Sequence, residues 1–83
     1  MESRVPLPIV YSTHARQRMS ERNVSSAQIE RVIRHADRLE QQATGRLCAE
    51  RRASDGARLR VIYEIREDST LGEHIIEVTV IRD

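Results

Sequence analysis

The sequence predicts an α+β fold, in which two N-terminal helices pack on one face of a three- to four-stranded antiparallel sheet. Two observations carry this prediction. Residues 14–37 show the period of amphipathic helices, broken once by a tight turn, whereas the residues after Asp37 alternate between apolar and polar side chains as strands do. Because the strands follow one another with no helix between them, they are expected to form a meander that the helices cover on one side.

The composition limits both the size of the core and the class of partner. A chain of 83 residues is expected to form one domain over residues 1–83, with a core that is aliphatic because there is no Phe or Trp and only two Tyr. The net charge of +1 argues against nucleic-acid binding driven by bulk charge, although a local basic patch can still bind phosphates. All 14 basic side chains are Arg, whose planar fork suits phosphate, but a GC-rich genome gives the same usage.

The chain begins with a segment that has little pattern. Residues 1–8 carry two prolines, which is typical of a loose arm or an edge strand because proline donates no hydrogen bond to a sheet. Residues 9–11 are expected to add a short strand, after which Ser12 or Thr13 caps the first helix.

The first helix carries the chemically suggestive residues. Ala15 and Met19 form a small apolar face, while His14, Arg18 and Arg22 recur every four residues and line a neighbouring strip. A His one turn from an Arg is compatible with catalysis, although a lone surface His more often belongs to a solvated helix edge.

The second helix has the stronger local signals. Ser25 and Gln28 are spaced as a capping box, and Val24 and Ile29 are spaced as a hydrophobic staple. An apolar stripe at helical spacing follows, made of Ile29, Val32, Ile33 and Ala36. This helix is therefore expected to pack against the sheet.

Strand patterns occupy the rest of the chain. Residues 39–44 and 46–52 are expected to pair around Gly45, and a hairpin is expected at residues 54–56. In the next strand, 58–66, the residues predicted to face the core are Leu59, Val61, Tyr63 and Ile65. A polar loop is expected at 67–73, and the residues predicted to face the core in the last strand, 75–81, are Ile76, Val78 and Val80.

The single cysteine, Cys48, excludes an internal disulfide and favours a reducing compartment. The N-terminus lacks the apolar run of a secretory signal, and no stretch is long enough to span a membrane. The expected location is therefore the cytoplasm, without membrane association. His14, His35, His74 and Cys48 show no metal-ligand spacing, so neither a metal site nor a cofactor is expected.

Four segments together resemble a family of small bacterial domains of unknown function: HARQRMSERNVS at 14–25, GRLCAER at 45–51, LRVIYEI at 59–65 and the terminal VTVIRD. That family has been grouped with RelE-like and barnase-like ribonucleases and toxin domains. The resemblance implies a RelE-like fold and a toxin-type function, namely metal-independent cleavage of RNA, with an antitoxin protein as partner.

By motif position, the resemblance places the family's leading His on His14, its following Arg on Arg18, its pre-turn Arg on Arg22 and its final-strand threonine on Thr79. The chain departs from many RelE-like nucleases, because it lacks their strong positive charge and their C-terminal aromatic or basic residues. These departures weaken the expectation of catalysis more than the expectation of a RelE-like fold.

RNA cleavage without a metal needs a base, an acid and a cation at the phosphorane. The predicted catalytic set is His14 as acid or base, Arg18 as the cation, and Glu64, or alternatively Glu50, as the second proton carrier. The residues predicted to bind the RNA are Arg22, Arg52, Arg60 and Thr79. His14 can reach the outer sheet face, which carries Glu64 and most of these residues, only if it lies at the rim of the sheet.

Two other functions remain open. One is a non-catalytic interaction domain of the same fold, which self-associates as a homodimer through a sheet edge or through its outer face. The charged outer residues then form only a cross-strand ladder of opposite charges. The other is a helix-turn-helix in which residues 25–37 read DNA and Arg31, Arg34 and Arg38 contact it.

Overall fold

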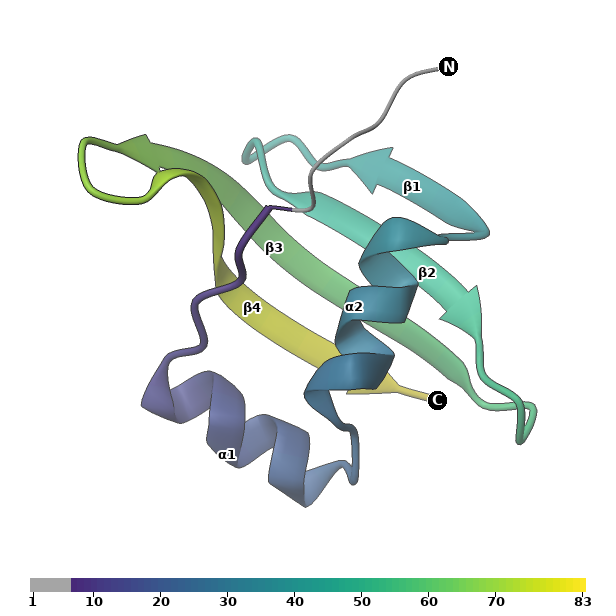
Figure 1. Ribbon diagram of the computed structural model, residues 1–83. Helices are drawn as coiled ribbons and strands as arrows, with labels where there is room; N and C mark the ends of the chain where they lie inside the picture. The colour runs from purple at the N-terminus through teal and green to yellow at the C-terminus, as the bar shows by residue number, and fades with distance from the viewer. Residues whose placement is uncertain (1–6) are drawn as a thin grey trace, which may run out of the picture.

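The computed structural model of the protein describes residues 7–83. Two helices, α1 (Thr13–Glu21) and α2 (Ser26–Arg34), precede four strands, which are β1 (Arg38–Gln41), β2 (Leu47–Arg52), β3 (Arg58–Asp68) and β4 (Gly72–Arg82). The strands form one antiparallel sheet in the order β1-β2-β3-β4 (Figure 1). The predicted α+β class and meander are confirmed.

Local hydrogen bonds fix both ends of α1. At its start, the backbone N–H of Ala15 donates to the Ser12 hydroxyl at 3.0 Å, so Ser12 is the N-cap. At its end, Asn23 adopts a left-handed conformation with φ 55°. Asn tolerates this conformation better than most residues, because its short side chain can bond locally. The chain thus leaves α1 abruptly and turns back over the sheet.

The capping box predicted for α2 is present. The N–H of Gln28 donates to the Ser25 hydroxyl at 3.2 Å, and the N–H of Ser25 donates to the Gln28 side-chain oxygen at 2.8 Å. Ile29 and Val32 are 0% and 1% exposed and face β2 and β3. The start of α2 is therefore fixed by hydrogen bonds between residues close in sequence, whereas its orientation is set by burial of its apolar stripe.

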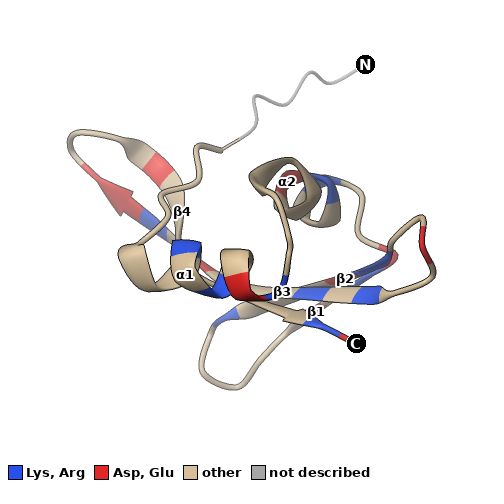
Figure 2. Cartoon of the chain, turned by 90° about the horizontal axis from the view of Figure 1, so that it is seen from below, with Lys and Arg blue, Asp and Glu red and all other residues tan. Residues whose placement is uncertain are grey.

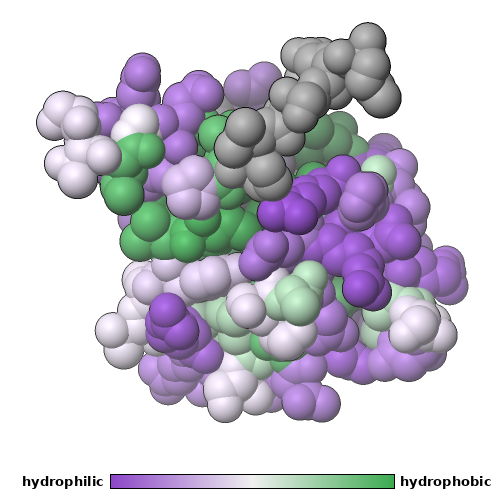
Figure 3. Space-filling model, in the orientation of Figure 1, coloured by the Kyte–Doolittle hydropathy of each residue, from purple (hydrophilic) through white to green (hydrophobic). Residues whose placement is uncertain are grey.

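The core lies between the helices and one face of the sheet. α2 packs on β2 and β3, and α1 packs on β4 (Figure 1). The buried apolar residues are Ala15, Met19, Val24, Ile29, Val32, Ala49, Leu59, Val61, Tyr63, Ile75, Val78 and Val80. As expected from the composition, this core is aliphatic apart from one Tyr. Figure 3 shows further apolar surface between α1 and the β3–β4 hairpin.

The segment before α1 adds to the outer edge of β4. Ile9 forms an isolated parallel bridge with Ile75, whose N–H donates to the Pro8 carbonyl at 2.9 Å, and the N–H of Val10 donates to the Ile75 carbonyl at 2.9 Å. The expected edge pairing before α1 is therefore present as a single bridge. Of the arm predicted over residues 1–8, residues 1–6 lie outside the part that the structure describes.

The loop predicted at 67–73 is mostly strand. β3 continues through Asp68, and the turn is confined to residues 69–71. The Asp68 carboxylate accepts the N–H groups of Thr70 at 2.9 Å and Leu71 at 2.6 Å, so its side chain satisfies the turn backbone. Polar residues can continue as strand here because this hairpin projects beyond the helices (Figure 1) and residues 65–71 are all exposed.

A bulge in β4 reverses which residues face the helices. Glu77 has φ 58°, and the pairing register shifts there so that one extra residue of β4 lies opposite β3. Before the bulge, Ile75 is 4% exposed, while Ile76 is only half-buried and is the cross-strand partner of Glu64. The prediction that Ile76 faces the core was wrong, because strict alternation does not survive an inserted residue.

Candidate functional site

His14 and Arg18 lie side by side on α1. The Nε of Arg18 donates to Nε2 of His14 at 3.4 Å, and its Nη1 lies 3.4 Å from a carboxylate oxygen of Glu21. Both side chains are exposed, and they meet because residues four apart share a helix face. An imidazole can accept or donate a proton near neutral pH, and here it lies next to a guanidinium.

Arg22 is the C-cap of α1 and is half-buried. Its Nη1 lies 3.9 Å from Glu21, which also contacts Arg18. Three of the predicted site residues, His14, Arg18 and Arg22, are thus on one short helix. Residues of both signs occur on α1 and along the strands (Figure 2).

The outer face of the sheet, opposite the helices, holds Glu64, Arg60 and Thr79. Several of its charged side chains have a partner of opposite sign at short range. The ion pairs are Arg58–Glu50 at 3.2 Å, Arg46–Glu64 at 3.7 Å, Arg66–Glu64 at 2.6 Å and Arg60–Asp83 at 3.0 Å. Such exposed pairs contribute about 0–1 kcal/mol each. Three of these pairs join neighbouring strands or their ends, as in the cross-strand ladder of the interaction-domain hypothesis, whereas Arg66 and Glu64 are both in β3.

Arg52 lies at the end of β2, beside the groove between α2 and the β2–β3 hairpin. This groove has a volume of about 200 Å³, and Arg31, Arg51 and Arg52 line it. Arg51 is held in place, because its Nη1 donates to the His35 carbonyl at 2.6 Å. Arg31 and Arg52 make no ion pair within residues 7–83. Sequence spacing could not reveal this groove, since helix and hairpin meet only in the folded chain.

The predicted site residues therefore fall into three groups: α1, the outer sheet face, and the groove. Across residues 7–83, no hydrogen bond or ion pair joins His14 to Glu64 or to Arg52. His14 lines neither this groove nor the hollow formed by the α1–α2 turn, Asp55 and Arg82. α1 does pack against β4, the strand that carries Thr79, so the α1 surface and the sheet edge are neighbours.

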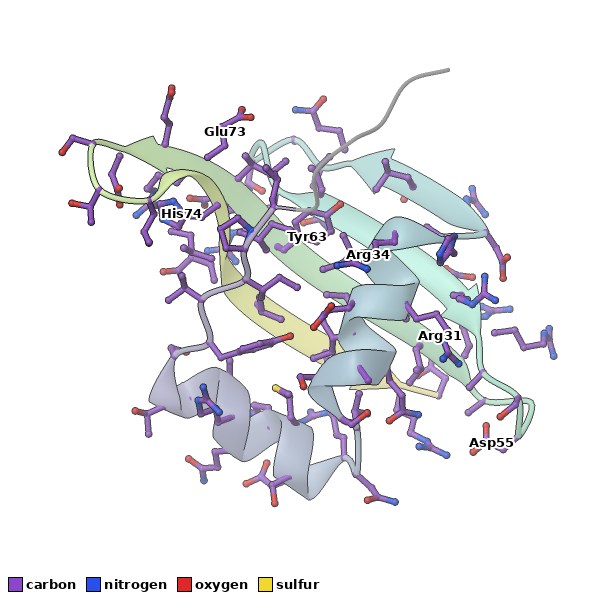
Figure 4. The ribbon with its side chains drawn as sticks, viewed as in Figure 1. Arg31, Arg34, Asp55, Tyr63, Glu73 and His74 are labelled. Carbon is purple, nitrogen blue, oxygen red and sulfur yellow. The ribbon has the colours of Figure 1, made fainter. Side chains whose placement is uncertain are left out.

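Two polar groups that the sequence did not single out are buried. His74 is 5% exposed on the β3–β4 hairpin; its Nδ1 lies 2.9 Å from the Gly72 carbonyl and its Nε2 3.7 Å from Asp68 (Figure 4). The N–H groups of Leu71 and Thr70, with a smaller contribution from His74, hold the pKa of Asp68 below its usual value. This arrangement braces the hairpin.

The other group is Tyr11, whose buried hydroxyl has no hydrogen-bond partner in the described chain. Burial, and then the nearby Glu30 carboxylate, raise the pKa of Tyr11. The Arg16 guanidinium lies 5.7 Å from the centre of its ring, a cation–π distance. Tyr11 therefore serves mainly to pack the segment before α1.

The arginines of the helix-turn-helix hypothesis are on two elements. Arg31 and Arg34 are exposed on α2 (Figure 4), and Arg34 lies 3.3 Å from Glu30, whereas Arg38 begins β1. Within residues 7–83 no cluster of three or more His, Cys, Asp or Glu side chains is arranged to hold a metal ion. The same residues include no helix of the length and apolarity that crossing a bilayer requires.

A family model described as a domain of unknown function, DUF4258, matches residues 11–82. The chain belongs to this family. The match covers α1, α2 and the whole sheet, so the family's sequence pattern and this α+β fold describe the same unit. Searches of curated proteins and of solved structures found no significant match. Membership of DUF4258 assigns no activity by itself, so function has to be argued from the residues.

Proposed function

We propose that this is a RelE-like, toxin-type domain that binds RNA and cleaves it without a metal ion. The observation that carries the proposal is the contact between His14 and Arg18 on the exposed surface of α1. It sets a proton carrier beside a cation, and these are two of the three groups that metal-free phosphodiester cleavage requires. The resemblance of residues 14–25 to the RelE-like group supports the same function.

In the proposed reaction, a base removes the proton of the ribose 2′-hydroxyl, the resulting oxygen attacks phosphorus, and an acid protonates the departing 5′-oxygen. His14 performs one proton transfer and Arg18 neutralises charge on the phosphorane. Glu64 is proposed for the other transfer. Because Arg46 and Arg66 hold Glu64 on the outer sheet face, its role needs a variant of its own.

The proposed RNA contacts are Arg22, Arg52, Arg60 and Thr79. Arg guanidinium groups can bind phosphate in a bidentate manner. A phosphate at Arg60 has to compete with Asp83, which lies 3.0 Å from its Nη2. The proposal also includes a cytoplasmic location, where RNA is available, and an antitoxin protein that restrains the domain.

Induction of the chain in bacteria tests the proposal directly. We expect growth arrest, and we expect the purified protein to cleave RNA in the presence of EDTA. His14→Ala and Arg18→Ala should abolish both effects, whereas Gln17→Ala, on the same exposed helix, should abolish neither. Glu64→Gln tests the second proton carrier separately. Normal growth together with intact RNA contradicts the proposal.

A second candidate function, a non-catalytic interaction domain, is favoured by one specific observation. β1 is an open edge of the sheet, and all four of its residues are exposed. An open edge is a template for pairing with another strand. This candidate predicts a protein that leaves RNA intact and forms a defined oligomer.

A further inference from the structure

We infer that β1 is a homodimer interface, in which β1 pairs antiparallel with β1 of a second copy about a two-fold axis at Leu39. The inference deepens the interaction-domain candidate and is independent of RNA cleavage. It rests on the order of the side chains in β1, on the faces to which they point, and on the direction of the main-chain hydrogen bonds.

The side chains of β1 are sorted between two faces. Leu39 pairs with Ala49, which is fully buried under the helices, so Leu39 is on the helix side of the sheet. Arg38 and Glu40 are on the other side. Leu39 is 59% exposed, the highest fraction among the large exposed hydrophobic residues of the described chain. Helix packing within one copy therefore leaves Leu39 uncovered.

The main-chain groups at the open edge belong to alternate residues. The N–H of Gln42 donates to the Arg46 carbonyl at 2.7 Å, and these residues continue the β1–β2 register. Arg38 and Glu40 therefore direct their N–H and C=O groups at β2, whereas Leu39 and Gln41 direct theirs outward. A second strand centred on Leu39 can therefore donate to the Leu39 carbonyl and accept from the Leu39 N–H.

The charges complement one another in this register. With Leu39 opposite Leu39 of the partner subunit, Arg38 lies opposite the partner's Glu40 and Glu40 opposite the partner's Arg38. These are non-hydrogen-bonded pairs, in which side chains approach most closely. Neither Arg38 nor Glu40 forms an ion pair within residues 7–83, so both are available to the partner.

Neighbouring two-fold registers are disfavoured. Centring the axis on Arg38 or on Glu40 sets two like charges directly opposite each other, which is destabilising.

An axis at Leu39 also keeps the helices of both copies on one side and joins two four-stranded sheets into one. Many edge strands carry charge that discourages pairing, but here the two signs flank Leu39 so that an identical strand satisfies both. The interface is short, so association should depend on protein concentration and weaken at high salt.

Charge-swap variants test the pairing by analytical ultracentrifugation. Arg38→Glu and Glu40→Arg should each weaken association about tenfold, because each turns two attractive pairs into two repulsive ones. The double variant R38E/E40R should regain association, and a mixture of the two single variants should form heterodimers. Glu67→Arg, on the distant hairpin, should associate as the unaltered chain does, and circular dichroism checks that each variant is folded.

Crosslinking tests the register. In a Cys48→Ser background, Leu39→Cys should form an intermolecular disulfide, since opposed Cα atoms in this register lie about 5.5 Å apart. Gln41→Cys should not, because its counterpart lies about 13 Å further along the ladder. A chain that is monomeric at all concentrations, a double swap that fails to restore association, or crosslinking at 41 in place of 39 overturns the inference. RNA cleavage by a monomer would leave the proposed nuclease intact while removing the dimer.

Discussion

The backbone N–H of Val24 donates to the carbonyl of Met19 at 2.9 Å, and the N–H of Asn23 donates to the carbonyl of Ser20 at 3.2 Å. Together these bonds close the end of α1 in a Schellman motif, with the side chains of Met19 and Val24 buried. This turn fixes where the chain leaves α1 and where α2 can begin. The turn requires a left-handed backbone at Asn23, which is a costly conformation for most residues.

Replacing Asn23 should therefore show this requirement. Asn23→Ala is expected to lower the free energy of unfolding by about 1 kcal/mol, because a Cβ without a bonding side chain is unfavourable at φ 55°. Asn23→Gly should be at least as stable as the unaltered chain. Urea unfolding followed by circular dichroism measures both. Equal stability of the Ala and Gly variants would show that the left-handed backbone at position 23 does not limit the stability of the fold.

The bulge residue Glu77 offers a gain in stability. Glu77→Gly is expected to raise the free energy of unfolding by about 0.5–1 kcal/mol, because Gly adopts φ 58° without a Cβ clash. Thr79→Gly is the matched control on the same exposed strand face. It should lower stability by about 1 kcal/mol, since glycine only weakens a regular strand position. Loss of stability in both variants would argue against strain at Glu77.

Asp68 should make stability pH-dependent. Its pKa is lowered in the folded chain relative to the ordinary value of 3.8, so its contribution is present above that value and is lost as the pH falls through the lower, folded pKa. Asp68→Ala should therefore be less stable than the unaltered chain at neutral pH, with the difference shrinking below about pH 4. Thermal melts between pH 2 and 7 check this, with Glu67→Ala as control. A difference that is constant with pH counts against the assignment.

Two isoleucines, one buried and one exposed, should differ in how much they contribute to stability. Ile29→Ala should cost about 2–5 kcal/mol, because this fully buried side chain leaves a cavity between α2 and the sheet. Ile65→Ala should cost less than about 1 kcal/mol, since Ile65 is 44% exposed on the projecting part of β3. Denaturant midpoints of the two variants provide the comparison, and similar losses would mean that Ile65 is covered in solution.

Local chemistry explains why so much of the fold could be predicted. The capping box of Ser25 and Gln28 and the stripe from Ile29 to Ala36 depend on contacts within a few residues, so their spacing is visible in the chain itself. The same holds for the hairpin at 54–56. By contrast, Ile65 and Ile76 were assigned to the core from alternation alone, which carries no information about where the helices end or where a strand bulges.

The same distinction between local and long-range contacts applies to the candidate site. The contact of His14 with Arg18 follows from four-residue spacing on a helix, and the sequence determined it. The groove beside Arg52, the ion pairs that hold Glu64, and the separation of both from His14 depend on which sheet face the helices cover. Only the tertiary structure decided these features, because burial of a shared apolar face fixes how distant segments meet, and no segment encodes that alone.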